Sequence, residues 1–140
     1  MSAALKPQLA DIVGADHVHD SAAASALFGA DIGAAGSGHV VLVVAPGSTV
    51  ELSRVVAAAT AAGCAVAPRG AGMSYTGGYV PAHPRTVAID TQRMSRVLNV
   101  DAKNMTVTVE AGCSWRALLE ALAPQGLRTP FWGPMSGIHS

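Results

Sequence analysis

A strand–helix–strand pattern in residues 39–68 constrains the fold more than any other feature of the chain. The run HVVLVVAP at 39–46 is apolar, rich in β-branched residues and closed by proline, which is typical of a strand covered on both faces. In the next segment, Ser48 and Glu51 form a capping box, and Gly63 stands where a left-handed C-terminal cap belongs. CAVAP at 64–68 predicts a second strand. The order here is therefore β-α-β.

Further strands and a second helix are predicted downstream. Residues 85–90, 95–101 and 105–112 have strand patterns, and we expect the last two to pair as a hairpin. A helix is predicted from Ser114, whose hydroxyl can cap it, until Pro124 and Gly126 stop it. The whole order predicts an α+β fold.

Residues 1–38 look different from the rest of the chain. They are rich in Ala, Gly and Ser and show one helical pattern near residues 5–13, but no strong strand. We therefore expect a leader that packs loosely on the remainder.

Charge and hydropathy exclude several classes of function. Nine Lys and Arg residues balance nine Asp and Glu residues, and no basic run or basic helix face is present, which argues against nucleic acid as a partner. The longest apolar stretch, at residues 40–45, is far too short to span a bilayer, and the N-terminus lacks the layout of a secretory signal. These features predict an intracellular, cytoplasmic protein without a membrane span. No feature specifies an oligomeric state.

Neither the cysteines nor the histidines predict a metal site. Cys64 and Cys113 lie far apart without a CxxC motif, so we expect two ordinary buried thiols. His17 and His19 lie on one side of an extended segment and can be imagined as metal ligands. Two histidines flanked by acids near a terminus more often form a solvated turn, which is the interpretation we favour.

The sequence PRGAGMSYTGG at residues 68–78 is the main candidate for binding chemistry. A Rossmann motif fails, because Tyr75 replaces the third glycine and no helix follows; a Walker loop fails because no Gly-Lys-Ser/Thr follows. Glycines let main-chain N–H groups turn inward around an anion, and Ser74 and Thr76 can add hydroxyl donors. A diphosphate fits this chemistry, and a plain turn remains the alternative.

Linked motifs resemble one known family. A capped helix after VVAP, the PRGAG loop, the strand TVAID followed by MSRVL, and VEAG leading into a helix occur in the order seen in the FAD-binding domain of the vanillyl-alcohol oxidase and p-cresol methylhydroxylase (PCMH) superfamily. The resemblance runs from about residue 40 to the C-terminus. It implies a PCMH-type FAD-binding domain with a complete first subdomain (39–78) and an incomplete second one (79–140), in a chain that we expect to be a fragment.

The resemblance also implies cofactor contacts. The diphosphate of FAD would lie against the loop, and a second contacting stretch would begin near residues 134–140. The implied cofactor-binding residues are Pro68, Arg69, Gly70, Ala71, Gly72, Met73, Ser74, Gly77, Gly78, Pro134, Ser136, Gly137 and Ser140. For Arg69 the residues themselves favour a structural role, bridging nearby carboxylates or carbonyls. Covalent members of the family often carry a flavin-linking histidine where this chain has Met73, which rules out attachment through this loop, whereas other members use a histidine far downstream. We expect the FAD to be bound non-covalently.

Two functions follow as hypotheses. The first is the FAD-binding portion of a flavin-dependent oxidoreductase that oxidises a small hydroxylated substrate, a 2-hydroxy acid or an alcohol. The second is a non-catalytic nucleotide-binding or accessory module of a larger flavoprotein. No carboxylate pair or nucleophile–base set is recognisable as catalytic; Asp90 and Glu110 end strands, where we expect them to accept hydrogen bonds from turn amides or a helix start.

Overall fold

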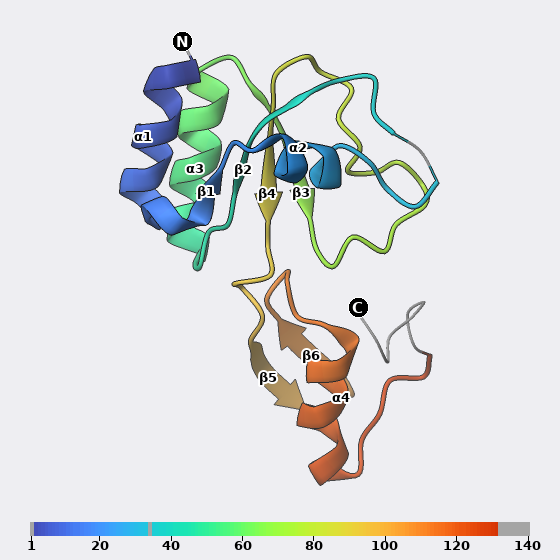
Figure 1. The fold of residues 1–140 in the computed structure, drawn as a ribbon. Helices are drawn as coiled ribbons and strands as arrows, with labels where there is room; N and C mark the ends of the chain where they lie inside the picture. The colour runs from blue at the N-terminus through green and yellow to red at the C-terminus, as the bar shows by residue number, and fades with distance from the viewer. Residues whose placement is uncertain (1, 34, 132–140) are drawn as a thin grey trace.

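The computed structural model describes residues 2–33 and 35–131, with side chains from residue 4 onward. Its larger part is a four-stranded sheet of β1 (Val18–His19), β2 (Val40–Val44), β4 (Thr86–Asp90) and β3 (Ala65–Arg69), in that spatial order (Figure 1). β2, β4 and β3 run parallel, and β1 pairs antiparallel with β2. Together with the helices, this sheet confirms the α+β class.

Helices cover both faces of the sheet. On one face, α1 (Ser2–Val13) and α3 (Thr49–Ala61) lie side by side (Figure 1) and form the main core with the strands. On the other face, α2 (Ala22–Phe28) places Ala24 and Phe28 against a smaller buried cluster of Val40, Val43 and Ala88. The continuous apolar runs of β2 and β4 are explained by this cover on both sides.

The caps of α3 are those predicted from the sequence. The Ser48 hydroxyl accepts a hydrogen bond from the Glu51 N–H at 3.2 Å, and the Glu51 carboxylate accepts one from the Gly47 N–H at 2.8 Å. Gly63 follows the helix with φ of 70°, the left-handed conformation that ends many helices. The predicted helix and its boundaries are confirmed.

The expectation of a loosely packed leader was wrong. Leu5, Leu9 and Val13 of α1 are buried in the main core, and Leu9 has no exposed surface. After a single 3₁₀ turn (η1, Ala15–His17), β1 adds a strand to the sheet, although the sequence had shown no strong strand here. A two-residue strand has too little sequence to carry a pattern, because its position depends on pairing with β2.

β4 lies inside the sheet, between β2 and β3. This position differs from the expected boundary between two subdomains at residue 78. Val87 of β4 pairs with Leu42 of β2 on one side and with Val66 of β3 on the other. β4 therefore belongs with the sheet that contains β2 and β3, although it falls within the range predicted for the second subdomain. Strand order is a long-range property that local patterns do not encode.

The smaller part of the described structure follows β4. β5 (Val97–Asp101) and β6 (Thr106–Val109) form the predicted antiparallel hairpin, and α4 (Trp115–Leu122) packs beside β5 (Figure 1). A 3₁₀ turn, η2 (Ala123–Gln125), and Gly126, with φ of 68°, end α4.

Gly112 brings this smaller part close to the sheet. A Cβ atom at Gly112 would lie 1.9 Å from the main-chain oxygen of Thr91, so no other residue fits without a shift of the backbone. The buried Thr91 hydroxyl is within hydrogen-bonding distance of the carbonyl oxygens of Arg69 (3.2 Å) and Ala111 (3.4 Å). The end of β3 and the start of α4 are thereby held near each other.

Among the described residues, no helix combines the length and the apolar character that crossing a bilayer requires.

Truncating Leu9 tests whether α1 belongs to the core. We expect Leu9→Ala to lower the free energy of unfolding by about 2–5 kcal/mol, because it leaves a cavity where no side-chain surface was exposed. Urea unfolding followed by circular dichroism measures the change. Leu27→Ala is the matched control, since Leu27 is 61% exposed in the same N-terminal region. Equal midpoints for the two variants would show that α1 does not contribute to the core.

Candidate functional site

Two glycines of the loop after β3 have a left-handed backbone conformation. Gly72 has φ of 77° and Gly77 has φ of 74°, a region that side chains with Cβ rarely adopt. A Cβ atom at Gly72 would also lie 2.4 Å from a guanidinium nitrogen of Arg69. The loop conformation therefore depends on glycine at position 72 for two separate reasons.

Two carbonyl groups of the loop accept hydrogen bonds from the protein, whereas several of its amides donate none. The Tyr79 hydroxyl donates to the Gly72 carbonyl oxygen at 2.8 Å, and the Ile32 N–H donates to the Ser74 carbonyl oxygen at 3.2 Å. Within the part of the chain that the structure describes, the N–H groups of residues 71–74 donate no hydrogen bond. Four consecutive amides are therefore available as donors, which is what the anion nest predicted from the sequence requires.

The predicted hydroxyl donors of the loop bind each other. Ser74 Oγ and Thr76 Oγ1 lie 3.0 Å apart, and Ser74 Oγ also accepts a hydrogen bond from the Thr76 N–H at 3.2 Å. One hydroxyl hydrogen is used within this pair, so at most one remains for a ligand.

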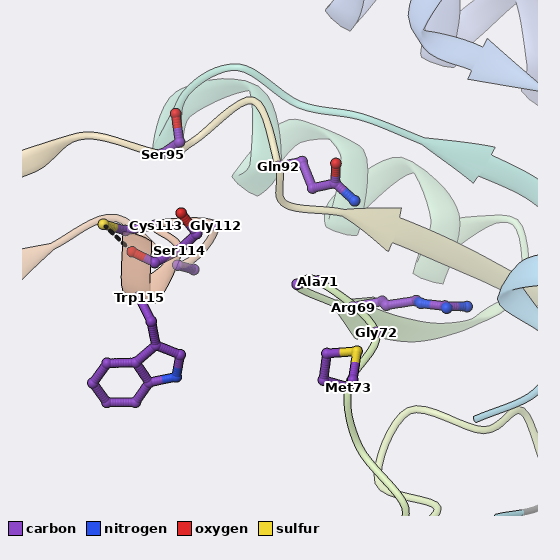
Figure 2. A pocket seen from close by; sticks show the side chains of 11 residues that line it. Arg69, Ala71, Gly72, Met73, Gln92, Ser95, Gly112, Cys113, Ser114 and Trp115 are labelled. Atoms are coloured by element: carbon purple, nitrogen blue, oxygen red, sulfur yellow. Dashed lines mark hydrogen bonds between the residues drawn. The ribbon is translucent and has the colours of Figure 1, made fainter. Parts of the chain in front are cut away.

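A cavity of about 670 Å³ opens between the loop and the start of α4 (Figure 2). Ala71, Gly72 and Met73 form one wall, and residues 111–115 form the facing wall. Gln92 and Ser95, from the connection between β4 and β5, complete the lining. Every one of these segments is a loop or a helix end, so the cavity is lined largely by main chain and small side chains.

The second wall carries the N-terminus of α4. Ser114 is the N-cap, and its hydroxyl accepts a hydrogen bond from the Ala117 N–H at 3.2 Å. The first N–H groups of an α-helix have no partner inside the helix, and the helix dipole places partial positive charge at this end. Both walls therefore offer main-chain N–H donors, the arrangement that suits an anionic group such as a phosphate.

Arg69 has the structural role that the sequence favoured. Its guanidinium donates hydrogen bonds to the carbonyl oxygens of Leu27 and, at 3.5 Å, Ala30, and lies 4.9 Å and 5.0 Å from the ring centroids of Phe28 and Tyr79. The side chain borders the cavity, yet its charged end points away from Cys113 and Trp115 (Figure 2). Its charge is thus largely used to hold the chain around the loop.

Comparison with known proteins agrees with this geometry. Residues 40–139 match a family model described as an FAD binding domain. The chain belongs to the FAD binding domain family. The predicted resemblance is confirmed, and the nest of free amides lies inside the matched region.

Relatives of this FAD binding domain include several flavoenzymes. The chain is 28% identical over 126 residues to the glycolate oxidase subunit GlcD of Bacillus subtilis (strain 168), which covers 90% of this chain and 27% of that protein. A solved structure of alkyldihydroxyacetonephosphate synthase is 28% identical, with a TM-score of 0.73 over 89% of this chain and 27% of that one. The structure of p-cresol methylhydroxylase, at 13% identity and a TM-score of 0.78 over 89% of this chain and 25% of that one, shares the fold. The chain thus spans about a quarter of the length of these proteins.

The structure distributes the predicted cofactor-binding residues of the FAD binding domain over three places. Arg69, Ala71, Gly72 and Met73 line the cavity. Pro68, Gly70, Ser74, Gly77 and Gly78 belong to the same loop region but not to the cavity lining, and the peptide bond before Pro68 is trans. Pro134, Ser136, Gly137 and Ser140 lie outside the described residues.

The facing wall of the cavity was missed from the sequence. Gln92, Ser95 and residues 111–115 line it, but none of them was predicted as a site residue. The helix start at Ser114 had been identified, and a glycine followed by a capped helix was the available signal. The sequence did not show that Gly112 contacts the main chain of Thr91, which brings this helix start close to the loop.

The cysteines and Asp90 were also considered in the sequence, and the structure shows their surroundings. Cys64 is buried, as expected, but Cys113 is half-buried and borders the cavity; both are free thiols. Burial, with a smaller effect of the Glu110 charge, raises the pKa of the Cys113 thiol. Asp90 accepts the Gln92 N–H, the turn-amide role that was predicted.

Glu110 also accepts a main-chain N–H, that of Arg96 at 2.9 Å. It pairs with the Arg96 guanidinium as well, and the hydrogen bond from that guanidinium lowers the pKa of the Glu110 carboxyl. In the described residues, His17 and His19 join no group of three or more metal-ligating side chains.

Proposed function

We propose that this domain binds FAD non-covalently, with its diphosphate between the glycine-rich loop and the N-terminus of α4. The protein would be an FAD-dependent oxidoreductase that oxidises a small hydroxylated substrate, a 2-hydroxy acid or an alcohol. The observation that carries the proposal is the set of free N–H groups at residues 71–74 in a member of the FAD binding domain family, since residues 71–73 border a cavity of about 670 Å³.

The charge distribution explains why main-chain groups would hold the diphosphate. Arg69 is the cationic side chain at the cavity, and its guanidinium already binds the carbonyl oxygens of Leu27 and Ala30. An anion in this place therefore depends on N–H dipoles and on the α4 terminus for compensation of its charge. Main-chain donors do not titrate, so binding of this kind is insensitive to the protonation of the loop's own side chains.

The cavity also favours a non-covalent complex. Met73 occupies the loop position at which covalent members of the resembling superfamily often carry histidine, and a thioether offers no ring nitrogen for a bond to the flavin at this loop. The raised pKa of Cys113 keeps that thiol protonated at neutral pH and so disfavours its reaction as a nucleophile.

The substrate class rests on the relatives. One of them is a glycolate oxidase subunit by name, and glycolate is a small 2-hydroxy acid. FAD, when bound, supplies the capacity to accept a hydride, while the protein supplies position and electrostatics. Besides FAD, we therefore expect the partner to be a small-molecule substrate. We place the protein in the cytoplasm, since Cys64 and Cys113 are free thiols, as is usual in reducing compartments.

A charge placed at Ala71 tests the diphosphate site. Ala71 is exposed and borders the cavity, so a small polar side chain fits there without disturbing the core. We expect Ala71→Asp to weaken FAD binding to the apoprotein by about tenfold or more, since like charges close together repel, whereas Ala71→Asn, of nearly equal size, loses much less. Titration with flavin fluorescence gives both dissociation constants. The same affinity for the two variants would place the diphosphate elsewhere.

Acid treatment tests the mode of attachment. We expect acid precipitation of the full-length holoprotein to release the flavin into the supernatant, because unfolding removes every main-chain contact and leaves no bond to the chain. Absorbance of the supernatant and of the redissolved pellet measures the partition. Flavin that stays with the pellet would disprove non-covalent binding.

Flavin reduction tests the substrate class. Anaerobic mixing of the full-length holoprotein with glycolate, other 2-hydroxy acids, alditols and phenols should bleach the flavin absorbance for the true class. We expect the 2-hydroxy acids or the alditols to do so, and the phenols to leave the flavin oxidised. Bleaching by the phenols alone would overturn the proposed substrate class.

A further inference from the structure

The hydroxyl of Tyr79 determines the direction of one of the free amides. It donates a hydrogen bond of 2.8 Å to the carbonyl oxygen of Gly72. In a planar trans peptide the C=O and the following N–H point in opposite directions. The bond that holds the Gly72 carbonyl therefore also aims the N–H of Met73 away from Tyr79, and Met73 is a residue that lines the cavity.

Without this bond, the Gly72–Met73 peptide would be poorly fixed. Gly72 has φ of 77°, and glycine passes between left- and right-handed conformations at little cost. A rotation of this peptide would reverse both groups, so that the Gly72 carbonyl oxygen took the direction that the Met73 N–H now has. For an anionic ligand, that exchange replaces a donor by a repelling partial negative charge.

Tyr79 is itself held in place. Its ring packs on the guanidinium of Arg69, 5.0 Å from centroid to Cζ, and that guanidinium binds the carbonyl oxygens of Leu27 and Ala30. The side chain is half-buried, so its position is determined by packing as well as by the hydrogen bond. The hydroxyl is therefore a fixed donor rather than a mobile surface group.

We propose that Tyr79 is a positioning residue for the cofactor: its hydroxyl holds the Gly72–Met73 peptide so that the Met73 N–H faces the diphosphate. This inference rests on the proposed binding of FAD at the loop. Tyr79 acts through the peptide and has no contact with the flavin ring in this role, so its effect is confined to the affinity for ligands that carry a diphosphate.

Tyr79→Phe separates this role from packing. Phenylalanine keeps the ring over Arg69 and removes only the donor to Gly72. The matched control is Tyr75→Phe, which removes a hydroxyl four positions away in the same loop region. Tyr75 is 66% exposed, and its hydroxyl makes no hydrogen bond within the described chain.

Binding of FAD and of ADP to the full-length apoproteins gives the first readout. We expect Tyr79→Phe to raise both dissociation constants by the same factor, about three- to tenfold, as for the loss of one hydrogen bond. Tyr75→Phe should bind both ligands like wild type, and the melting temperatures of the three apoproteins should agree. Equal factors for FAD and ADP locate the effect at the part that these ligands share, which a general loss of structure does not predict.

The amide resonance of Met73 gives a second readout, whose first measurement uses the wild-type protein alone. In wild-type apoprotein, ADP should move the Met73 N–H proton downfield, as a hydrogen bond to phosphate requires, and the movement should shrink in Tyr79→Phe. If wild type binds FAD but Tyr79→Phe binds it equally well, or if the Met73 resonance does not respond to ADP, this inference alone is overturned. If wild type binds neither FAD nor ADP, the proposed function fails with it.

Discussion

The contact between Gly112 and the main chain of Thr91 decides where the smaller part of the structure lies. Because no Cβ atom fits between them, the chain passes directly from the end of β6 across the end of β4. The helix start at Ser114 then lines the same cavity as the glycine-rich loop. Free amides occur in many turns, and every helix has an N-terminus. The proposed anion site depends on the two lying opposite each other across one cavity.

A second constraint operates inside the loop, where hydrogen bonds are distributed unevenly. The carbonyl oxygens of Gly72 and Ser74 are used by Tyr79 and Ile32, while the amides of residues 71–74 are left for a ligand. Amides without a partner in the protein, at the border of a cavity, are available to water or to a ligand. This uneven use of donors and acceptors is a physical reason to regard the loop as a binding element instead of a connection.

Local features were predictable from the sequence, and long-range contacts were not. The caps of α3 at Ser48 and Gly63, the β5–β6 hairpin and the loop itself follow from patterns within a few residues. The burial of Leu9, the central place of β4 and the wall at residues 111–115 depend on which distant segments meet. Linked motifs indicated the family, because their order reflects the fold, yet they did not show which side chains border the cavity.

Hydrogen bonds join the N-terminal region to the glycine-rich loop, so the affinity for the cofactor is coupled to the stability of the sheet. Asp31 accepts hydrogen bonds from the Gly33 N–H at 2.8 Å and, across the chain, from the Gly77 N–H at 2.7 Å. Ile32 holds Ser74, and the Arg69 guanidinium binds the carbonyl oxygens at the end of α2. A ligand that binds only the ordered loop stabilises every contact that orders it, by a free energy that grows with the logarithm of ligand concentration. Segments remote from the cavity, such as α2, therefore belong to the energetics of the site even though none of their residues borders it.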